Sequence, residues 1–275
     1  MNFAPCQDVT QIDQALNQFK LSLQDEPGIH KYFVQAYLGV NQAVLDYYQD
    51  SDRTDNKLID WEFYQLLSAE FANRYLIQLT RFVEGNKADE PWQTVFEKSL
   101  NYQDTGLAIS AGLMAHIHFD LPMTLIGMEQ SYFSTDRNLG NTQRAAYFAM
   151  DHVVASSLPN MVNAAFEMMQ EHDQTNELTF KYGTIYKKLN ARFRHLYITC
   201  VIVLIRREAW WHFHQLKSNV MSPEQLSCLT VKRINQLGSS GKAIDFFKMV
   251  LQNSLYIFRL GLGFLAQHRI GARAN

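Results

Sequence analysis

The sequence predicts an all-α protein, a single domain of about seven to nine helices packed around one apolar helix at residues 106–128. Apolar side chains recur at spacings of three and four along most of the chain, which is the helical period. Alternating strand patterns and Asn-Gly or Asp-Gly hairpin signals are missing. Gly and Pro are scarce, 13 and 6 of 275 residues, and mostly mark joints. With no linker long enough to divide domains, one domain over residues 1–275 is expected.

Capping signals and polar loops divide the chain into these helices. Asp8 or Thr10 can cap the first helix, and Pro91 suits the first turn of a short one. Pro122 is expected to kink or end the apolar helix, because proline has no amide hydrogen to donate. The helices are expected at about residues 8–24, 32–44, 58–82, 92–101, 105–128, 142–171, 177–216, 223–237 and 241–268.

Charge and cysteine content exclude some classes of protein. The formal net charge of −2 argues against a nucleic-acid binder, which carries a basic excess. Three distant cysteines without a CxxC pair support neither a disulfide framework nor a cysteine zinc site. The N-terminal residues lack the basic and apolar regions of a signal peptide, so a cytoplasmic protein is expected. The 106–128 run is long enough to span a membrane, but ionisable residues at its centre favour a buried core helix.

The first candidate metal ligands interrupt the apolar helix. His116 and Asp120 are four residues apart and share one helix face, whereas His118 points elsewhere. A buried carboxylate without a partner costs several kcal/mol, so Asp120 needs compensation. A shared metal ion, a hydrogen-bonded Asp–His pair or an arginine from another helix would each supply it. Glu70 is a further carboxylate candidate, or it forms an ordinary surface pair with Arg74.

A second pair with the same spacing is Glu208 and His212. Together with the first pair it could form a carboxylate and imidazole site for zinc, iron or manganese. The sequence favours the alternative, a surface pair in which Glu208 binds its neighbours Arg206 and Arg207.

Three motifs carry a resemblance to a known family: FANRYL at 71–76, PWQTVFE at 91–97 and GLMAHIHFDLP at 112–122. In order and spacing they resemble an uncharacterised bacterial family, domain of unknown function 5995. The family's third motif commonly reads Gly-Met-Asn-Ala-His-Ile-Asn-x-Asp-Leu. His116 and Asp120 match it, whereas Met114 and His118 stand where asparagines are usual. The resemblance implies that His116 and Asp120 belong to the part that the members share, and it brings no established activity.

The third motif is also similar, more weakly, to helical zinc-dependent phospholipases C. Those enzymes use a His-x-x-x-Asp pair on a buried helix, with the aspartate bridging metal ions. This similarity implies that His116 and Asp120 bind metal. The later His-x-x-x-Glu motif of those enzymes is absent, since Glu208 and His212 reverse its order.

Three hypotheses of function follow. The first is a metal-dependent, hydrolase-like enzyme with His116 and Asp120 as ligands. The second is a non-catalytic helical domain that binds an apolar small molecule or a protein partner, since 13% aromatic residues could line a pocket. The third is a structural role for the pair. Substrate, metal identity and oligomeric state are left open.

Overall fold

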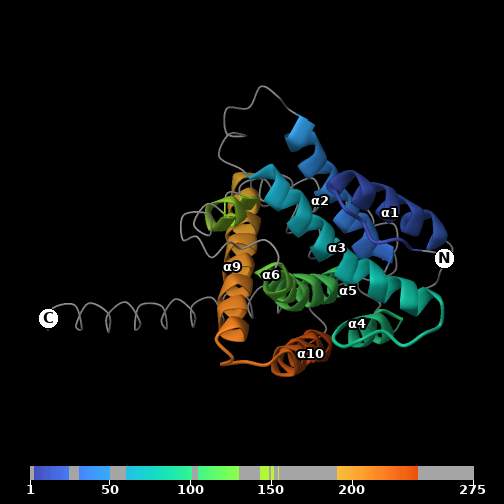
Figure 1. The fold of residues 1–275 in the computed structure, drawn as a ribbon. Helices are drawn as coiled ribbons and strands as arrows, with labels where there is room; N and C mark the ends of the chain where they lie inside the picture. Colours follow the sequence, from blue (N-terminus) through green and yellow to red (C-terminus); the bar gives the residue numbers. More distant parts are fainter. Residues whose placement is uncertain are drawn as a thin grey trace, which may run out of the picture.

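The computed structural model describes residues 3–24, 31–49, 60–100, 105–129, 143–148, 150–151, 154 and 191–240. Within these ranges the regular structure is helical and contains no strand, which confirms the all-α prediction (Figure 1). The helices are α1 (Val9–Ser22), α2 (Lys31–Gln49), α3 (Trp61–Val83), α4 (Trp92–Ser99), α5 (Thr105–Leu113), η2 (Met114–Asp120), α6 (Leu121–Glu129), α9 (Ala191–Lys217) and α10 (Pro223–Ser240). The helix expected at 241–268, and most of the one expected at 142–171, lie outside the described residues.

Side-chain caps set two of the helix starts. The Asp8 carboxylate accepts a hydrogen bond from the backbone nitrogen of Gln11 at 2.8 Å, so Asp8 rather than Thr10 caps α1. Asp60 accepts from the backbone nitrogen of Phe63 at 3.0 Å in the same way. The third helix therefore begins at residue 61, a few residues later than its periodicity indicated.

The apolar helix is continuous from α5 through α6, and Pro122 does not end it. Its centre, η2, is a π-helical segment, in which the Leu121 nitrogen donates to the carbonyl of His116 five residues earlier. This wider turn lies directly before the proline, whose nitrogen has no hydrogen to donate. A π-helical segment inside an α-helix is often found at functional sites.

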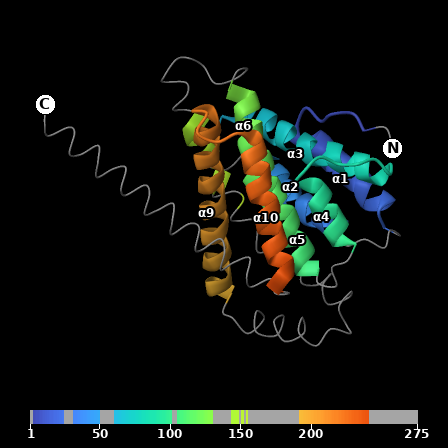
Figure 2. The same ribbon diagram turned by 90° about the horizontal axis from the view of Figure 1, so that it is seen from below.

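The apolar helix lies at the centre of the described helices. Its π-helical part packs against α3, α9 and α10, and Figure 2 shows α9 and α10 running alongside it. Residues Ala108–Glu129 are long and apolar enough to cross a membrane, but 72% of the window is buried inside the protein, as expected of a core helix. Close packing also explains Gly112, because a Cβ atom there would come within 2.5 Å of the Phe33 ring.

Candidate metal centre and the His116–Asp120 pair

The two histidines of η2 belong to two different clusters. Residues two apart on a helix point in nearly opposite directions. His116 remains with Asp120, four residues later, whereas His118 meets Glu208 and His212 of α9. The six candidate ligands predicted from the sequence therefore do not converge on one point.

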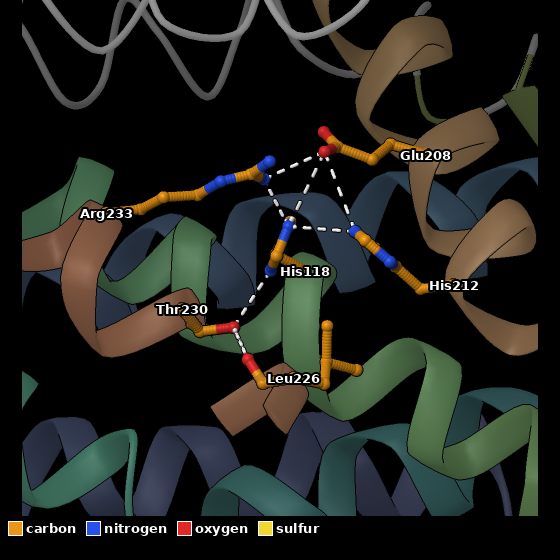
Figure 3. Close-up of polar contacts among 6 residues, drawn as sticks. All are labelled: His118, Glu208, His212, Leu226, Thr230 and Arg233. Carbon is orange, nitrogen blue, oxygen red and sulfur yellow. Dashed lines mark hydrogen bonds and ion pairs between the residues drawn. The ribbon is translucent and has the colours of Figure 1, made fainter. Parts of the chain in front are cut away.

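The cluster around His118 brings together three side chains that could hold a metal ion (Figure 3). The Nε2 atoms of His118 and His212 are 3.1 Å apart, and Oε1 of Glu208 lies 3.5 Å and 3.6 Å from them. The point equidistant from these three atoms is about 2.0 Å from each, which is the length of a zinc bond to histidine or carboxylate. All three residues are at most 3% exposed.

Thr230 of α10 sets the tautomer of His118. Its hydroxyl donates to the carbonyl of Leu226 at 2.8 Å, so it faces Nδ1 of His118, also at 2.8 Å, as an acceptor. Nδ1 then carries the imidazole hydrogen and Nε2 presents its lone pair to the cluster. A hydrogen-bonded outer nitrogen of this kind orients metal-binding histidines. Nδ1 of His212 has no such partner within the described part of the chain.

Arg233 of α10 already supplies a positive charge to this cluster. Its guanidinium lies 2.8 Å from Oε1 of Glu208 and also contacts Nε2 of His118 (Figure 3). Burial raises the pKa of Glu208, but the adjacent His118 and His212 and the Arg233 charge together hold it well below the ordinary value. Burial lowers the pKa of His118 to about 4, against the opposing effect of Glu208. A carboxylate and a neutral imidazole therefore face each other at neutral pH, the states that metal binding needs.

The His116–Asp120 pair is a hydrogen-bonded pair in the core. His116 Nδ1 lies 3.0 Å from Asp120 Oδ2, and the indole of Trp92 donates to the same oxygen at 2.8 Å. The Phe71 ring stacks on the imidazole at a centroid distance of 3.6 Å and an angle of 8°. Of the three predicted partners for the buried Asp120 carboxylate, these contacts match the hydrogen-bonded Asp–His pair. Arg74 instead donates to the carbonyl of Met123 at 3.1 Å.

The three sequence motifs meet at this pair. Phe71 comes from FANRYL, Trp92 from PWQTVFE, and the pair itself from GLMAHIHFDLP. FANRYL also contains Asn73, whose amide bonds both the nitrogen and the carbonyl of Cys6, at 2.7 Å and 2.8 Å. The motifs therefore describe one packed unit made of segments distant in sequence.

The expected surface pairing of Glu208 is wrong. Glu208 is buried, and its arginine partner is Arg233. Arg206 instead binds Asp151 at 2.5 Å and the carbonyl of Tyr147 at 2.6 Å. Arg206 and Glu208 are two apart on α9, so they face different neighbours.

Sequence reasoning also missed Arg233 and Thr230, and it named one candidate that lies elsewhere. The two α10 residues are three apart and share one face of the helix, but nothing in their spacing indicates which helix that face meets. Glu70 is exposed on α3 and belongs to neither cluster.

Fold and site together define an all-α protein whose core helix carries a His–Asp pair and, two residues away, one ligand of a His/Glu/His group that could hold a metal ion. The chain belongs to a family described as a family of unknown function (DUF5995), whose sequence model matches residues 9–243. This match confirms the predicted family, and the matched residues include both clusters. Neither a curated protein nor a solved structure matches the chain. The likeness to phospholipases C stays a prediction.

Proposed function

We propose that this protein is a metal-dependent, hydrolase-like enzyme that holds one divalent transition-metal ion between His118, Glu208 and His212. The observation that carries the proposal is the convergence of three buried donor atoms around a point about 2.0 Å from each, a zinc-ligand distance. Among the described residues, this is the group of three or more histidine, cysteine, aspartate or glutamate side chains that could hold an ion.

The donor set favours zinc and a catalytic role. Two histidines and one glutamate are a known protein ligand set of catalytic zinc, and the fourth position is left to water. Iron and manganese accept the same donors. Water bound in this way ionises near neutral pH and becomes a nucleophile, which is the chemistry that the ion would supply.

Arg233 suggests the kind of substrate. Its side chain is 11% exposed, whereas those of the three donors are 1–4% exposed, so it lies toward solvent from them. An ion bound by Glu208 would take over the charge that this guanidinium now balances. The freed guanidinium suits a phosphate or carboxylate oxygen, which it can bind through two parallel hydrogen bonds. We therefore propose a substrate with an anionic group beside the bond that is cleaved.

The sequence predicted His116 and Asp120 as metal ligands, but this proposal gives them a structural role. The pair offers only two donor residues, and Asp120 Oδ2 already accepts from Trp92. We assign the pair to the packing of η2, the segment that presents His118 to α9, and leave metal binding by the pair as an untested prediction.

Metal content tests the proposal. The full chain is stripped with a chelator, reloaded with zinc and measured by elemental analysis, alongside Glu208→Gln, His212→Gln and the control His116→Gln. We expect one ion per chain in the wild type and in the control, and loss of the ion in the other two variants. Hydrolysis of p-nitrophenyl phosphate and p-nitrophenyl acetate should depend on zinc in the wild type.

Two results would overturn the proposal. A wild-type chain that takes up no zinc, iron or manganese would leave the cluster as a buried ion-pair network with Arg233. A chain that binds the ion but hydrolyses neither ester would remove the enzymatic part and leave a structural metal.

A further inference from the structure

A cavity of about 110 Å³ lies on the His116 side of η2, away from the proposed ligands. Its wall is mostly apolar and aromatic. The side chains that matter here come from α2, α3 and the middle of the apolar helix: Phe33, Tyr37, Tyr64, Phe71, Leu113 and His116.

His116 brings an unpaired hydrogen-bond acceptor to this wall. Asp120 Oδ2 accepts the indole hydrogen of Trp92, so it also faces His116 Nδ1 as an acceptor. The imidazole hydrogen is therefore on Nδ1, and Nε2 on the other edge of the ring keeps its lone pair. Nε2 is buried without a hydrogen-bond partner among the described residues, and His116 is only 3% exposed. A buried acceptor without a donor is unfavourable, so a donor in the cavity would stabilise it.

We infer that this cavity binds a small neutral molecule of the phenol class, a compact aromatic body with one hydroxyl that donates a hydrogen bond to Nε2 of His116. This inference does not depend on the proposed metal site. An engineered apolar cavity of about 150 Å³ takes up benzene, so the smaller space here admits at most one small aromatic ring. Aromatic rings in the wall, among them Phe71 and Tyr37, suit an aromatic body through edge-to-face or offset contacts.

The charges around the cavity favour a neutral ligand over an ion. The guanidinium that lines the cavity, Arg206, already has its charge balanced by Asp151 and donates to the Tyr147 carbonyl, so a neutral ligand fits.

A pair of probes isolates the hydrogen bond. Phenol and toluene have similar shapes, but only phenol can donate. Both are titrated by calorimetry into the wild type, into His116→Phe, which keeps a ring against Phe71, and into the control His214→Phe, the same exchange at an exposed position of α9. The ratio of the toluene to the phenol dissociation constant cancels the different hydration of the two probes.

We expect that ratio to fall roughly fivefold to tenfold in His116→Phe, the effect of one hydrogen bond, and to be unchanged in His214→Phe. Ala36→Val narrows the cavity and should weaken the binding of phenol and of toluene equally. This variant tests the cavity even if His116→Phe does not fold. In that case the ¹⁵N shift of His116 Nε2 should respond to phenol and not to toluene. An unchanged ratio, an unresponsive Nε2, or a wild type that binds neither probe at millimolar concentration would overturn the inference.

Discussion

Replacing Arg233 with methionine should make the stability of the protein depend strongly on zinc. The Arg233 guanidinium and the Glu208 carboxylate lie 2.8 Å apart and are largely buried. Two unit charges about 4 Å apart attract each other by about 4 kcal/mol at an effective dielectric constant of 20. Removing one member of a buried pair typically costs about 3–5 kcal/mol, because the other charge is left without compensation. We therefore expect Arg233→Met to lower the free energy of unfolding by that amount in a chelator.

Zinc should reverse most of this loss. An ion held by Glu208 and the two histidines supplies the positive charge that methionine lacks, and it no longer has to displace a guanidinium. The difference between variant and wild type should shrink to about 1 kcal/mol in excess zinc, through the linkage between binding and folding. Urea unfolding followed by circular dichroism, with chelator and with zinc, measures both differences. The neighbouring exposed residue gives the control, Lys232→Met, which should change stability by less than about 0.5 kcal/mol in either condition. If Arg233→Met lowered the free energy of unfolding equally with and without zinc, the idea that zinc replaces the positive charge of Arg233 would be refuted.

Three further predictions test the packing and protonation of the core. Gly112→Ala should lower stability by about 1–2 kcal/mol because its Cβ would come within 2.5 Å of the Phe33 ring, whereas Gly39→Ala, with nothing within 4 Å, should raise it by about 0.5–1 kcal/mol. Urea unfolding of both variants checks this, and a stabilising Gly112→Ala would contradict it. Asp120→Ala should lower stability by about 3–5 kcal/mol by leaving two buried donors unpaired. Asp120→Asn should lower it less, because its amide oxygen still accepts a hydrogen bond. Equal losses of stability in thermal unfolding would contradict the hydrogen-bonded pair. Burial lowers the pKa of His118 to about 4, below the unfolded value of about 6.5, so the unfolded chain binds its proton first as pH falls. Stability in chelator should therefore decrease between pH 6.5 and pH 4, by up to about 3 kcal/mol, and less in His118→Gln; a flat profile would contradict the buried neutral imidazole.

Local contacts could be predicted from the sequence because neighbours in sequence determine them. The helical period, the start of α1 at Asp8 or Thr10 and the core position of the apolar helix follow from residues within a few turns of one another; the structure chose Asp8 as the cap. The His116–Asp120 contact is of the same kind, because a spacing of four brings two side chains together on almost any helix. The π-helical turn was not predicted, although Pro122 did mark the place where regular hydrogen bonding would be disturbed.

The sequence by itself determined that the protein is helical, that it belongs to its family of unknown function, and that two pairs of possible ligands lie on helix faces. Only the tertiary structure decided how those faces meet. His118 joins Glu208 and His212 across 90 and 94 residues, and Arg233 reaches the same point from α10. The physical reason is that spacing along a helix fixes the direction of a side chain relative to its own axis. Which distant helix covers that side chain depends on how all the apolar faces pack together, and no local pattern contains that information.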